Sequence, residues 1–193
     1  VLLQTDDLLG GSPDGVAGLG VPARQLATMA LGLTDVYVLQ ASASHLVQFR
    51  EQIMRGITWI GPALFSVFSG ASGASSDLPP YLVAAAAMES RAFPAFVYDP
   101  GGGRDWASRF DVRGNPQPDA DWPIRRLTYE DEAHQRISED LAFTAVDFLA
   151  CDRRNDRHLA GAARGAKTAD FVSITAWLAA PTATMPTSIP AVL

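Results

Sequence analysis

Two neighbouring carboxylates near the start of the chain are the residues whose types and spacing best suit chemistry. Asp6 and Asp7 follow a short apolar run that we expect to be a strand, and they precede Gly10-Gly11. Carboxylate oxygens are ligands that magnesium prefers, so this arrangement could face a magnesium diphosphate. The alternative is an ordinary solvated loop, and the residues alone leave both interpretations open.

Other residues of chemically useful types lack the partners that their chemistry needs. Gly101-Gly-Gly103 is followed by Arg104 and lacks the Lys-Ser/Thr of a phosphate-binding loop, so we interpret it as a turn. Cys151 could be an activated thiol, but no histidine is placed beside it. The histidines are too far apart for a metal-binding motif, which favours solvated side chains. They are His45, His134 and His158.

Length and composition restrict the class of protein. With 193 residues, of which 48% are hydrophobic and 19% charged, the chain can bury the core of one domain, with or without an appendage. Its apolar runs are shorter than the roughly 20 residues that a membrane span needs. Its net charge of −6 is unfavourable for a nucleic-acid surface. The single cysteine excludes an internal disulfide. We therefore expect a cytoplasmic protein with no nucleic-acid or membrane partner.

The elements that would position the acidic residues alternate between strands and helices. Strands or extended segments are expected at 1–4, 36–39, 62–68 and 93–98. Helices are expected at 22–31, 44–56 and 81–91. The apolar run from Pro62 to Phe68 is typical of a strand buried on both faces of a parallel sheet. The pattern predicts an α/β fold with a parallel sheet, flanking helices and a ligand site at the carboxyl ends of the strands.

The chain changes character after Pro100. Glycines and prolines between 101 and 123 indicate an extended segment. Thr128 and Asp131 match a capping-box pattern, which predicts a helix from Tyr129 to Leu149. We therefore expect a domain at 1–123 and a helical C-terminal extension of undetermined role at 124–193.

Several segments, in their order and spacing, resemble the end of the thiamine-diphosphate domain of pyruvate:ferredoxin oxidoreductases. They are Arg24-Gln-Leu-Ala-Thr-Met-Ala-Leu-Gly32, Asp35-Val-Tyr-Val-Leu-Gln40 and Gly61-Pro-Ala-Leu-Phe-Ser-Val-Phe-Ser69. Ala84-Ala-Ala-Ala-Met-Glu-Ser-Arg91 and Phe96-Val-Tyr-Asp-Pro100 resemble the family's closing helix and its Tyr-Asp-Pro strand. The resemblance covers about residues 1 to 123 and implies the C-terminal part of a thiamine-diphosphate-binding fold.

The resemblance also implies a reaction. In this family thiamine diphosphate and Mg²⁺ support the oxidative decarboxylation of a 2-oxoacid such as pyruvate, iron-sulfur clusters pass electrons to ferredoxin or flavodoxin, and coenzyme A takes the acyl group. The clusters and a Gly-Asp-Gly loop that holds part of the cofactor would lie in sequence outside this chain. Because the chain begins in an apolar run at Val1, we expect a fragment of a longer protein, and the family implies a homodimer.

The family's second cofactor-binding segment is only partly present. If the glycine pairs are aligned, leucines precede Gly10-Gly11 where the family has Asn and Thr, and Leu3 replaces the metal-binding threonine. A deletion would instead put Thr5 in the threonine's place, with Asp6 next to it. Metal-ligating and catalytic residues stay undetermined. The cofactor-binding candidates are Thr5, Asp6, Gly10 and Gly11.

A further departure follows the strand that ends at Phe68. The family commonly carries an iron-sulfur cysteine there, and this chain has Ala71. The first hypothesis is therefore a divergent fragment of a 2-oxoacid:ferredoxin oxidoreductase-like enzyme. The second is a degenerate, non-catalytic domain with a structural or subunit-assembly role. The third is an unrelated doubly wound domain with a different ligand.

Overall fold

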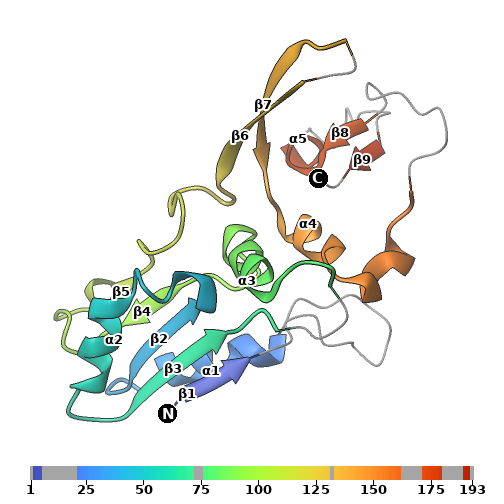
Figure 1. The fold of residues 1–193 in the computed structure, drawn as a ribbon. Helices are drawn as coiled ribbons and strands as arrows, with labels where there is room; N and C mark the ends of the chain where they lie inside the picture. The colour runs from blue at the N-terminus through green and yellow to red at the C-terminus, as the bar shows by residue number, and fades with distance from the viewer. Residues whose placement is uncertain are drawn as a thin grey trace.

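A five-stranded sheet in the order β1-β3-β2-β4-β5 forms the centre of the molecule (Figure 1). The computed structural model describes residues 2–5, 21–71, 76–130, 133–161, 171–179 and 189–191. The strands are β1 (Leu2–Thr5), β2 (Tyr37–Ser42), β3 (Ala63–Phe68), β4 (Phe96–Tyr98) and β5 (Phe110–Asp111). The helices are α1 (Val21–Leu31), α2 (Arg50–Ile57) and α3 (Pro80–Glu89). The expected α/β class is confirmed.

Strands β1, β3 and β2 are parallel, and they end together. Thr5 and Ser42, the last residues of β1 and β2, both lie beside Phe68, the last residue of β3. Strand β2 is buried along its whole length, as expected of a central strand whose two faces are covered by helices. We call the line formed by Thr5, Ser42 and Phe68 the carboxyl edge of the sheet.

The expectation of an entirely parallel sheet is wrong at β4, which runs antiparallel to β2 and to β5. Helix α3 explains the reversal, because it packs at the carboxyl edge: Phe68 clusters with Val83 and Ala84, and Ser42 Oγ donates to the Ala84 carbonyl at 2.6 Å. Figure 1 shows α3 standing at the ends of β2 and β3. The chain therefore re-enters the sheet from the carboxyl edge, which gives an antiparallel strand.

Helices α1 and α2 cover opposite faces of the sheet. Ala27 and Ala30 of α1 cluster with Val38 and Tyr98, whereas the α2 side packs Ile53 against other residues of the sheet. The residues on the α2 side include Tyr37, Leu39, Phe65 and Val97. This alternation along β2 follows from the two-residue period of a strand.

Gly56 lets α2 approach the sheet closely. A Cβ at this position would lie 2.6 Å from Cε1 of Tyr37 and 2.8 Å from Cζ of Phe65. Both neighbours are ring atoms, which cannot move aside as the end of a flexible side chain can. The glycine thus sets the height of α2 above the sheet.

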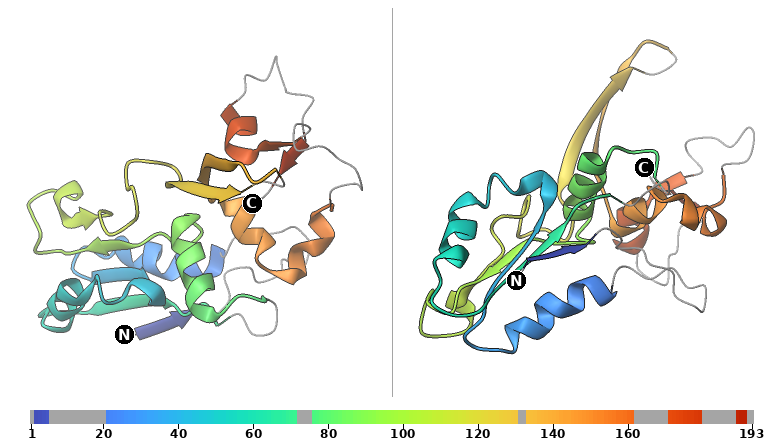
Figure 2. Two further views of the ribbon diagram at one scale, coloured as in Figure 1. Left: turned by 45° about the horizontal axis from the view of Figure 1, so that its top comes forward. Right: turned by 60° about the horizontal axis from the view of Figure 1, so that its bottom comes forward.

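The prediction of a helix from Tyr129 to Leu149 is wrong over most of its length. Strands β6 (Ile124–Glu130) and β7 (Arg136–Ala142) form an antiparallel hairpin instead. Its cross-strand pairs explain the conformation, since Arg126 bonds Asp140 at 2.8 Å and Thr128 bonds Ser138 at 3.0 Å. The hairpin stands out from the sheet in Figures 1 and 2.

The helix begins only at α4 (Ala145–Ala150), after the hairpin. Thr144 and Asp147 form its capping box, with the Thr144 N–H donating to Asp147 Oδ2 at 2.6 Å. Phe148 then packs into the cluster that contains Phe68 and Phe93, which ties α4 to the carboxyl edge.

The remaining described elements are short. They are the 3-10 helices η1 (Ala43–His45), η3 (Ala107–Arg109) and η4 (Arg153–His158), the strands β8 (Phe171–Ser173) and β9 (Ile189–Ala191), and the helix α5 (Ile174–Ala179). Strands β8 and β9 are parallel to each other. The extension is therefore mixed rather than helical. Among the described residues, no helix combines the length and the apolar character that crossing a membrane requires.

Candidate functional site

The predicted cofactor-binding residues belong to the carboxyl edge or to the segment that follows it. Thr5 ends β1 and lies in register with Phe68, so strands β1 and β3 end side by side. The other candidates, Asp6, Gly10 and Gly11, lie outside the described residues. The side chain of Thr5 is not described either.

The hydroxyl group of Ser42 at the carboxyl edge is already bonded. Ser42 is fully buried, and its Oγ lies 2.7 Å from Ser44 Oγ as well as 2.6 Å from the Ala84 carbonyl. Ser44 Oγ in turn lies 2.7 Å from Nδ1 of His45, and burial lowers the pKa of this histidine. Within the described ranges, no group of three or more His, Cys, Asp or Glu side chains could hold a metal ion.

Two weaker sequence candidates have structural roles. The N–H of Gly102 donates to the Asp99 carbonyl at 2.9 Å, which confirms the glycine tract as a turn. Cys151 Sγ donates to the Asp147 carbonyl at 3.4 Å, and burial raises the pKa of this thiol, with Asp147 and Asp152 adding to the effect. A raised pKa leaves less thiolate, so the site does not activate Cys151.

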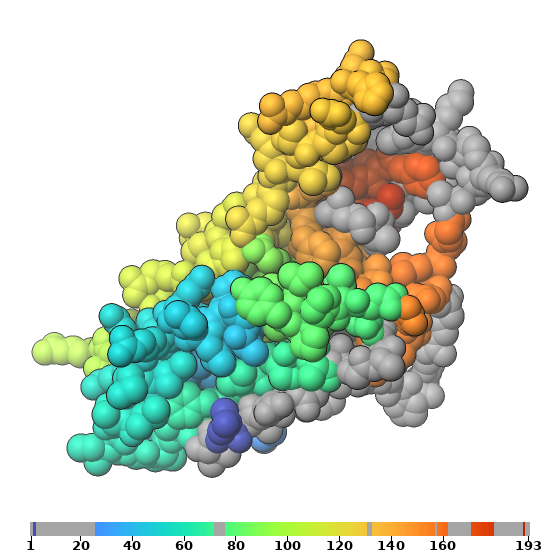
Figure 3. All heavy atoms as spheres, in the orientation of Figure 1, coloured from blue at the N-terminus to red at the C-terminus, as the bar shows by residue number. Residues whose placement is uncertain are grey.

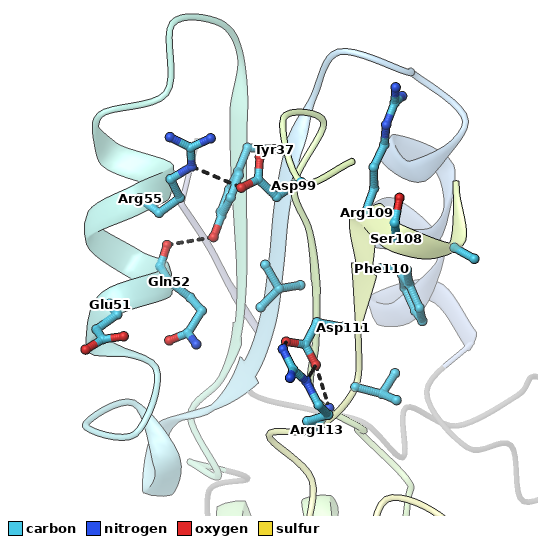
Figure 4. A pocket seen from close by; sticks show the side chains of 14 residues that line it. Tyr37, Glu51, Gln52, Arg55, Asp99, Ser108, Arg109, Phe110, Asp111 and Arg113 are labelled. Atoms are coloured by element: carbon cyan, nitrogen blue, oxygen red, sulfur yellow. Dashed lines mark hydrogen bonds and ion pairs between the residues drawn. The ribbon is translucent and has the colours of Figure 1, made fainter. Parts of the chain in front are cut away.

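A polar groove, which the sequence does not predict, lies between α2 and the outer strands β4 and β5 (Figure 4). Its volume is about 520 Å³, and Val97 forms part of its floor. The groove exists because α2 covers β2 and β3 but leaves the same face of β4 and β5 open. Its polar lining residues are Tyr37, Glu51, Gln52, Arg55, Asp99, Ser108, Arg109, Asp111 and Arg113.

Arg55 and Asp99 form an ion pair at one end of the polar groove. Arg55 Nε lies 3.0 Å from Asp99 Oδ2, while Asp99 Oδ1 accepts from the N–H of Gly101 at 2.9 Å. The Arg55 guanidinium also lies 5.7 Å from the ring centroid of Trp59, within cation–π range. The hydrogen bond from Arg55 to Asp99 raises the pKa of the guanidinium, so it stays charged.

Asp111 and Arg113 form a second ion pair farther along the groove. Arg113 donates from Nε at 3.0 Å and from Nη2 at 2.7 Å, one bond to each carboxyl oxygen. These hydrogen bonds lower the pKa of Asp111, although partial burial opposes the shift. Asp111 points to this face because its neighbour in register is Val97, which also faces α2.

Tyr37 and Gln52 connect the groove to the core. The Tyr37 hydroxyl donates to the backbone carbonyl of Gln52 at 2.7 Å. Burial raises the pKa of Tyr37 from 10.0 to about 12, and the negative charge of Asp99 adds to the shift. The phenol therefore stays protonated at neutral pH. Oε1 of Gln52 is buried without a hydrogen-bond partner.

Sequence reasoning misses this groove because its residues come from segments that are far apart in the chain. One local signal could have indicated it: Asp111 stands between Phe110 and Val112, where a strand covered on both faces would carry apolar residues. Comparison with protein-family models, with curated proteins and with solved structures finds no significant match to this chain.

Proposed function

We propose that the chain is the C-terminal part of a thiamine-diphosphate-binding domain in a 2-oxoacid (pyruvate):ferredoxin oxidoreductase-like protein. The longer protein would carry out the oxidative decarboxylation of a 2-oxoacid. Coenzyme A and ferredoxin or flavodoxin would be its partners, and iron-sulfur clusters elsewhere would carry the electrons. The proposal rests on the segments between Arg24 and Pro100 that resemble this family.

The structural observation that supports the proposal most is the carboxyl edge. Three parallel strands end in register at Thr5, Phe68 and Ser42, and ligands of open α/β sheets bind beyond such strand ends. The candidate segment 6–20 begins at this edge because it follows Thr5 directly. Thiamine diphosphate bound there would supply the nucleophilic carbon for decarboxylation.

The described residues alone do not fit a magnesium diphosphate. They hold no group of acidic or histidine side chains suited to a metal ion, and the hydroxyl of Ser42 is occupied by the Ala84 carbonyl and Ser44. We therefore assign no catalytic step to them. In the proposal, Asp6 contributes to binding of the cofactor, and the metal ligands stay undetermined.

Calorimetric titration of thiamine diphosphate into the natural full-length protein, with and without Mg²⁺, tests the proposal. We expect Mg²⁺-dependent binding that Asp6→Asn weakens by about tenfold, which corresponds to ~1.4 kcal/mol. Asp140→Asn is the matched control, because it removes an exposed carboxylate on β7. Absence of binding at about millimolar cofactor would contradict the proposal.

A second candidate function is a degenerate domain kept for subunit assembly. It is favoured by Ala71, which stands where the resembling family has a cluster cysteine and whose N–H donates to Ser69 Oγ at 3.1 Å. This reading predicts that the full-length protein forms a stable oligomer by light scattering but binds no thiamine diphosphate. Magnesium-dependent cofactor binding would exclude it.

A further inference from the structure

The hairpin of β6 and β7 has an open strand edge. It is a two-stranded sheet, and within the described ranges no third strand pairs with β6. Every residue of β6 is exposed, and Figure 3 shows the hairpin, in yellow and gold, as a projection at the upper end of the molecule. A two-stranded hairpin by itself is only marginally stable in water, and additional strands stabilise it. The edge of β6 is therefore suited to accept another strand.

The two faces of β6 differ in character. Arg126 and Glu130 lie on one face and Leu127 and Tyr129 on the other, because side chains alternate along a strand. The two apolar side chains are 49% and 40% exposed. On the charged face, Glu130 has no hydrogen bond or ion pair in the described part of the chain. A strand that pairs with this edge must therefore complement charges on one face and apolar surface on the other.

Strand β6 is complementary to a second copy of itself. We consider two β6 strands that run antiparallel about a two-fold axis at Thr128. Arg126 then lies opposite the partner's Glu130, and the symmetry repeats this pair of opposite charges. On the other face, Leu127 lies opposite the partner's Tyr129. Opposite charges across a strand pair are favourable, and burial of the apolar side chains removes their surface from water.

Other symmetric pairings of the hairpin fit less well. An axis at Arg126 would place two guanidinium groups directly opposite each other, which is destabilising. An axis at Leu127 would place Ile124 opposite the partner's Glu130 and leave the charges unpaired. Strand β7 is a weaker candidate than β6, since three of its residues are partly buried. The charges therefore select one strand and one register.

We propose that two copies of the protein associate through β6, so that their hairpins form one antiparallel four-stranded sheet with Thr128 on its two-fold axis. The hairpin lies outside the residues that resemble the oxidoreductase family, and the proposal does not depend on the functions proposed above. A contact made by a strand edge buries less area than a standard interface, so we expect a dissociation constant on the order of 10–100 µM.

Sedimentation velocity of the full chain, from about 1 to about 500 µM, measures this association. The sedimentation coefficient should rise with concentration to that of a dimer. Arg126→Glu places carboxylates opposite each other in the paired strands, and Glu130→Arg places guanidinium groups opposite each other, so each variant alone should associate about tenfold more weakly. An equimolar mixture of the two variants restores opposite charges and should associate like the wild type. Arg50→Glu, a charge reversal at an exposed residue of α2, should change nothing.

Cysteine substitutions test the register without changing the charge. Thr128→Cys brings two thiols together at the axis, where the Cβ atoms of opposite residues are about 5 Å apart. Ser138→Cys is the matched control, because Ser138 bonds Thr128 across the hairpin and would lie about 14 Å, three strand spacings, from its own copy. Under mild oxidation, non-reducing electrophoresis should show a linked dimer for Thr128→Cys. Ser138→Cys should give no more dimer than the wild type, whose single cysteine is Cys151.

Four results would each overturn the proposal. A monomeric wild type over the whole concentration range would leave the edge to a different partner, and a dimer that persists unchanged in Arg126→Glu would place the contact elsewhere. The others are a mixture of charge variants that associates no better than each variant alone, and equal cross-linking of Thr128→Cys and Ser138→Cys. Circular dichroism checks folding, and if a charge variant unfolds, the cysteine variants decide. Because no sample contains Mg²⁺ or thiamine diphosphate, the outcome is independent of the cofactor experiment.

Discussion

Helix α2 separates two grooves of opposite character on the same face of the sheet. The polar groove over β4 and β5 receives Gln52 and Arg55. On the other side of the helix, an apolar groove of about 280 Å³ receives Ile53 and Ile57. Consecutive helical residues point in different directions, so one short helix can line both. The other residues of the apolar groove are Leu2, Leu39, Leu46, Phe65 and Val67.

The difference indicates how stability and recognition are divided along α2. On the apolar side, Ile53 packs against the cluster that contains Tyr37 and Phe65, so burial there holds the helix to the sheet. On the polar side, the arginines of both ion pairs are more than half exposed, and pairs that solvent screens contribute little to stability. We therefore expect the apolar contacts to determine folding and the polar side chains to determine what binds.

The largest expected effect comes from removing the close contact under α2. Gly56→Ala places a methyl group 2.6 Å from Tyr37 and 2.8 Å from Phe65, so the helix must lift and both grooves must change. We expect the free energy of unfolding to fall by about 1–3 kcal/mol, as in other overpacked cores. Urea denaturation monitored by circular dichroism measures the change.

Gly161→Ala is the matched control for this substitution, because a Cβ at Gly161 would meet nothing within 4 Å. It should leave the free energy of unfolding unchanged, or raise it slightly because alanine lowers the conformational entropy of the unfolded chain. Equal stability of Gly56→Ala and the wild type would contradict the close distance between α2 and the sheet in the structure.

Adjacent residues of α2 test the contrast between its two sides directly. Ile53→Ala removes packing in a partly buried cluster and should cost about 1–2 kcal/mol, less than the full cost of a completely buried isoleucine. Gln52→Ala removes a side chain whose Oε1 has no partner, so we expect a change within about 0.5 kcal/mol. Thermal and urea unfolding of both variants decide whether the sides differ.

The sequence predicts the elements near α2 better than it predicts the grooves. Strand β3 is recognisable because its apolar run is continuous, and α1 because Pro22 and Gly32 mark its ends. The reversal at β4 is not predictable from local pattern, since it depends on α3 packing at the carboxyl edge. The polar groove likewise depends on tertiary structure, because Arg55 meets Asp99 across a long stretch of chain.

The Thr-x-x-Asp pattern of a capping box occurs twice in the chain, and the sequence alone does not show which copy begins a helix. Thr128 and Asp131 have the same spacing as Thr144 and Asp147. The second pair forms a capping box, whereas Asp131 lies outside the described residues. The second pair precedes Phe148, which packs in the core and stabilises the short helix. The first pair begins in a strand, where Thr128 bonds Ser138 across the hairpin.

Tyr37 lines the polar groove and also packs in the core. Removing its hydroxyl should lower the free energy of unfolding by a smaller amount than the two core substitutions, and this loss should depend on pH. Tyr37→Phe loses the bond to the Gln52 carbonyl, which should cost about 1 kcal/mol at neutral pH. The folded-state pKa of Tyr37, about 12, is above its usual value of 10.0, so the native state holds this proton more tightly than the unfolded state. This contribution to stability is complete below the unfolded pKa and is lost as the pH rises through the folded pKa.

Urea midpoints measured from neutral to alkaline pH therefore separate Tyr37 from other tyrosines. The wild type should lose stability between pH 10.0 and about 12, and Tyr37→Phe should lack that part of the decline. Tyr81→Phe, which changes an exposed tyrosine on α3, should follow the wild type. A decline in Tyr37→Phe as steep as that of the wild type would contradict the assignment.

We expect the smallest effect on stability at the ion pair of Asp111 and Arg113, where the main change should be in the titration of Asp111. Arg113→Ala removes the side-chain hydrogen bonds that lower the pKa of Asp111, although the backbone N–H at position 113 still donates to Oδ1. Carbon-detected NMR should show the pKa of Asp111 rising in Arg113→Ala, while Arg50→Ala leaves it unchanged.

The lowered pKa of Asp111 also links this ion pair to the pH dependence of stability. A lowered carboxyl pKa stabilises the fold at pH values above the pKa of the unfolded state, and this contribution is lost as the pH falls through the pKa of the folded state. The wild type and Arg113→Ala should therefore differ in stability near neutral pH, and this difference should disappear in acid. If Arg113→Ala moves the Asp111 titration but shifts the urea midpoint less than Ile53→Ala does, the ion pair sets the charge of the polar groove and the apolar side holds the helix. A larger midpoint shift in Arg113→Ala would reverse that division.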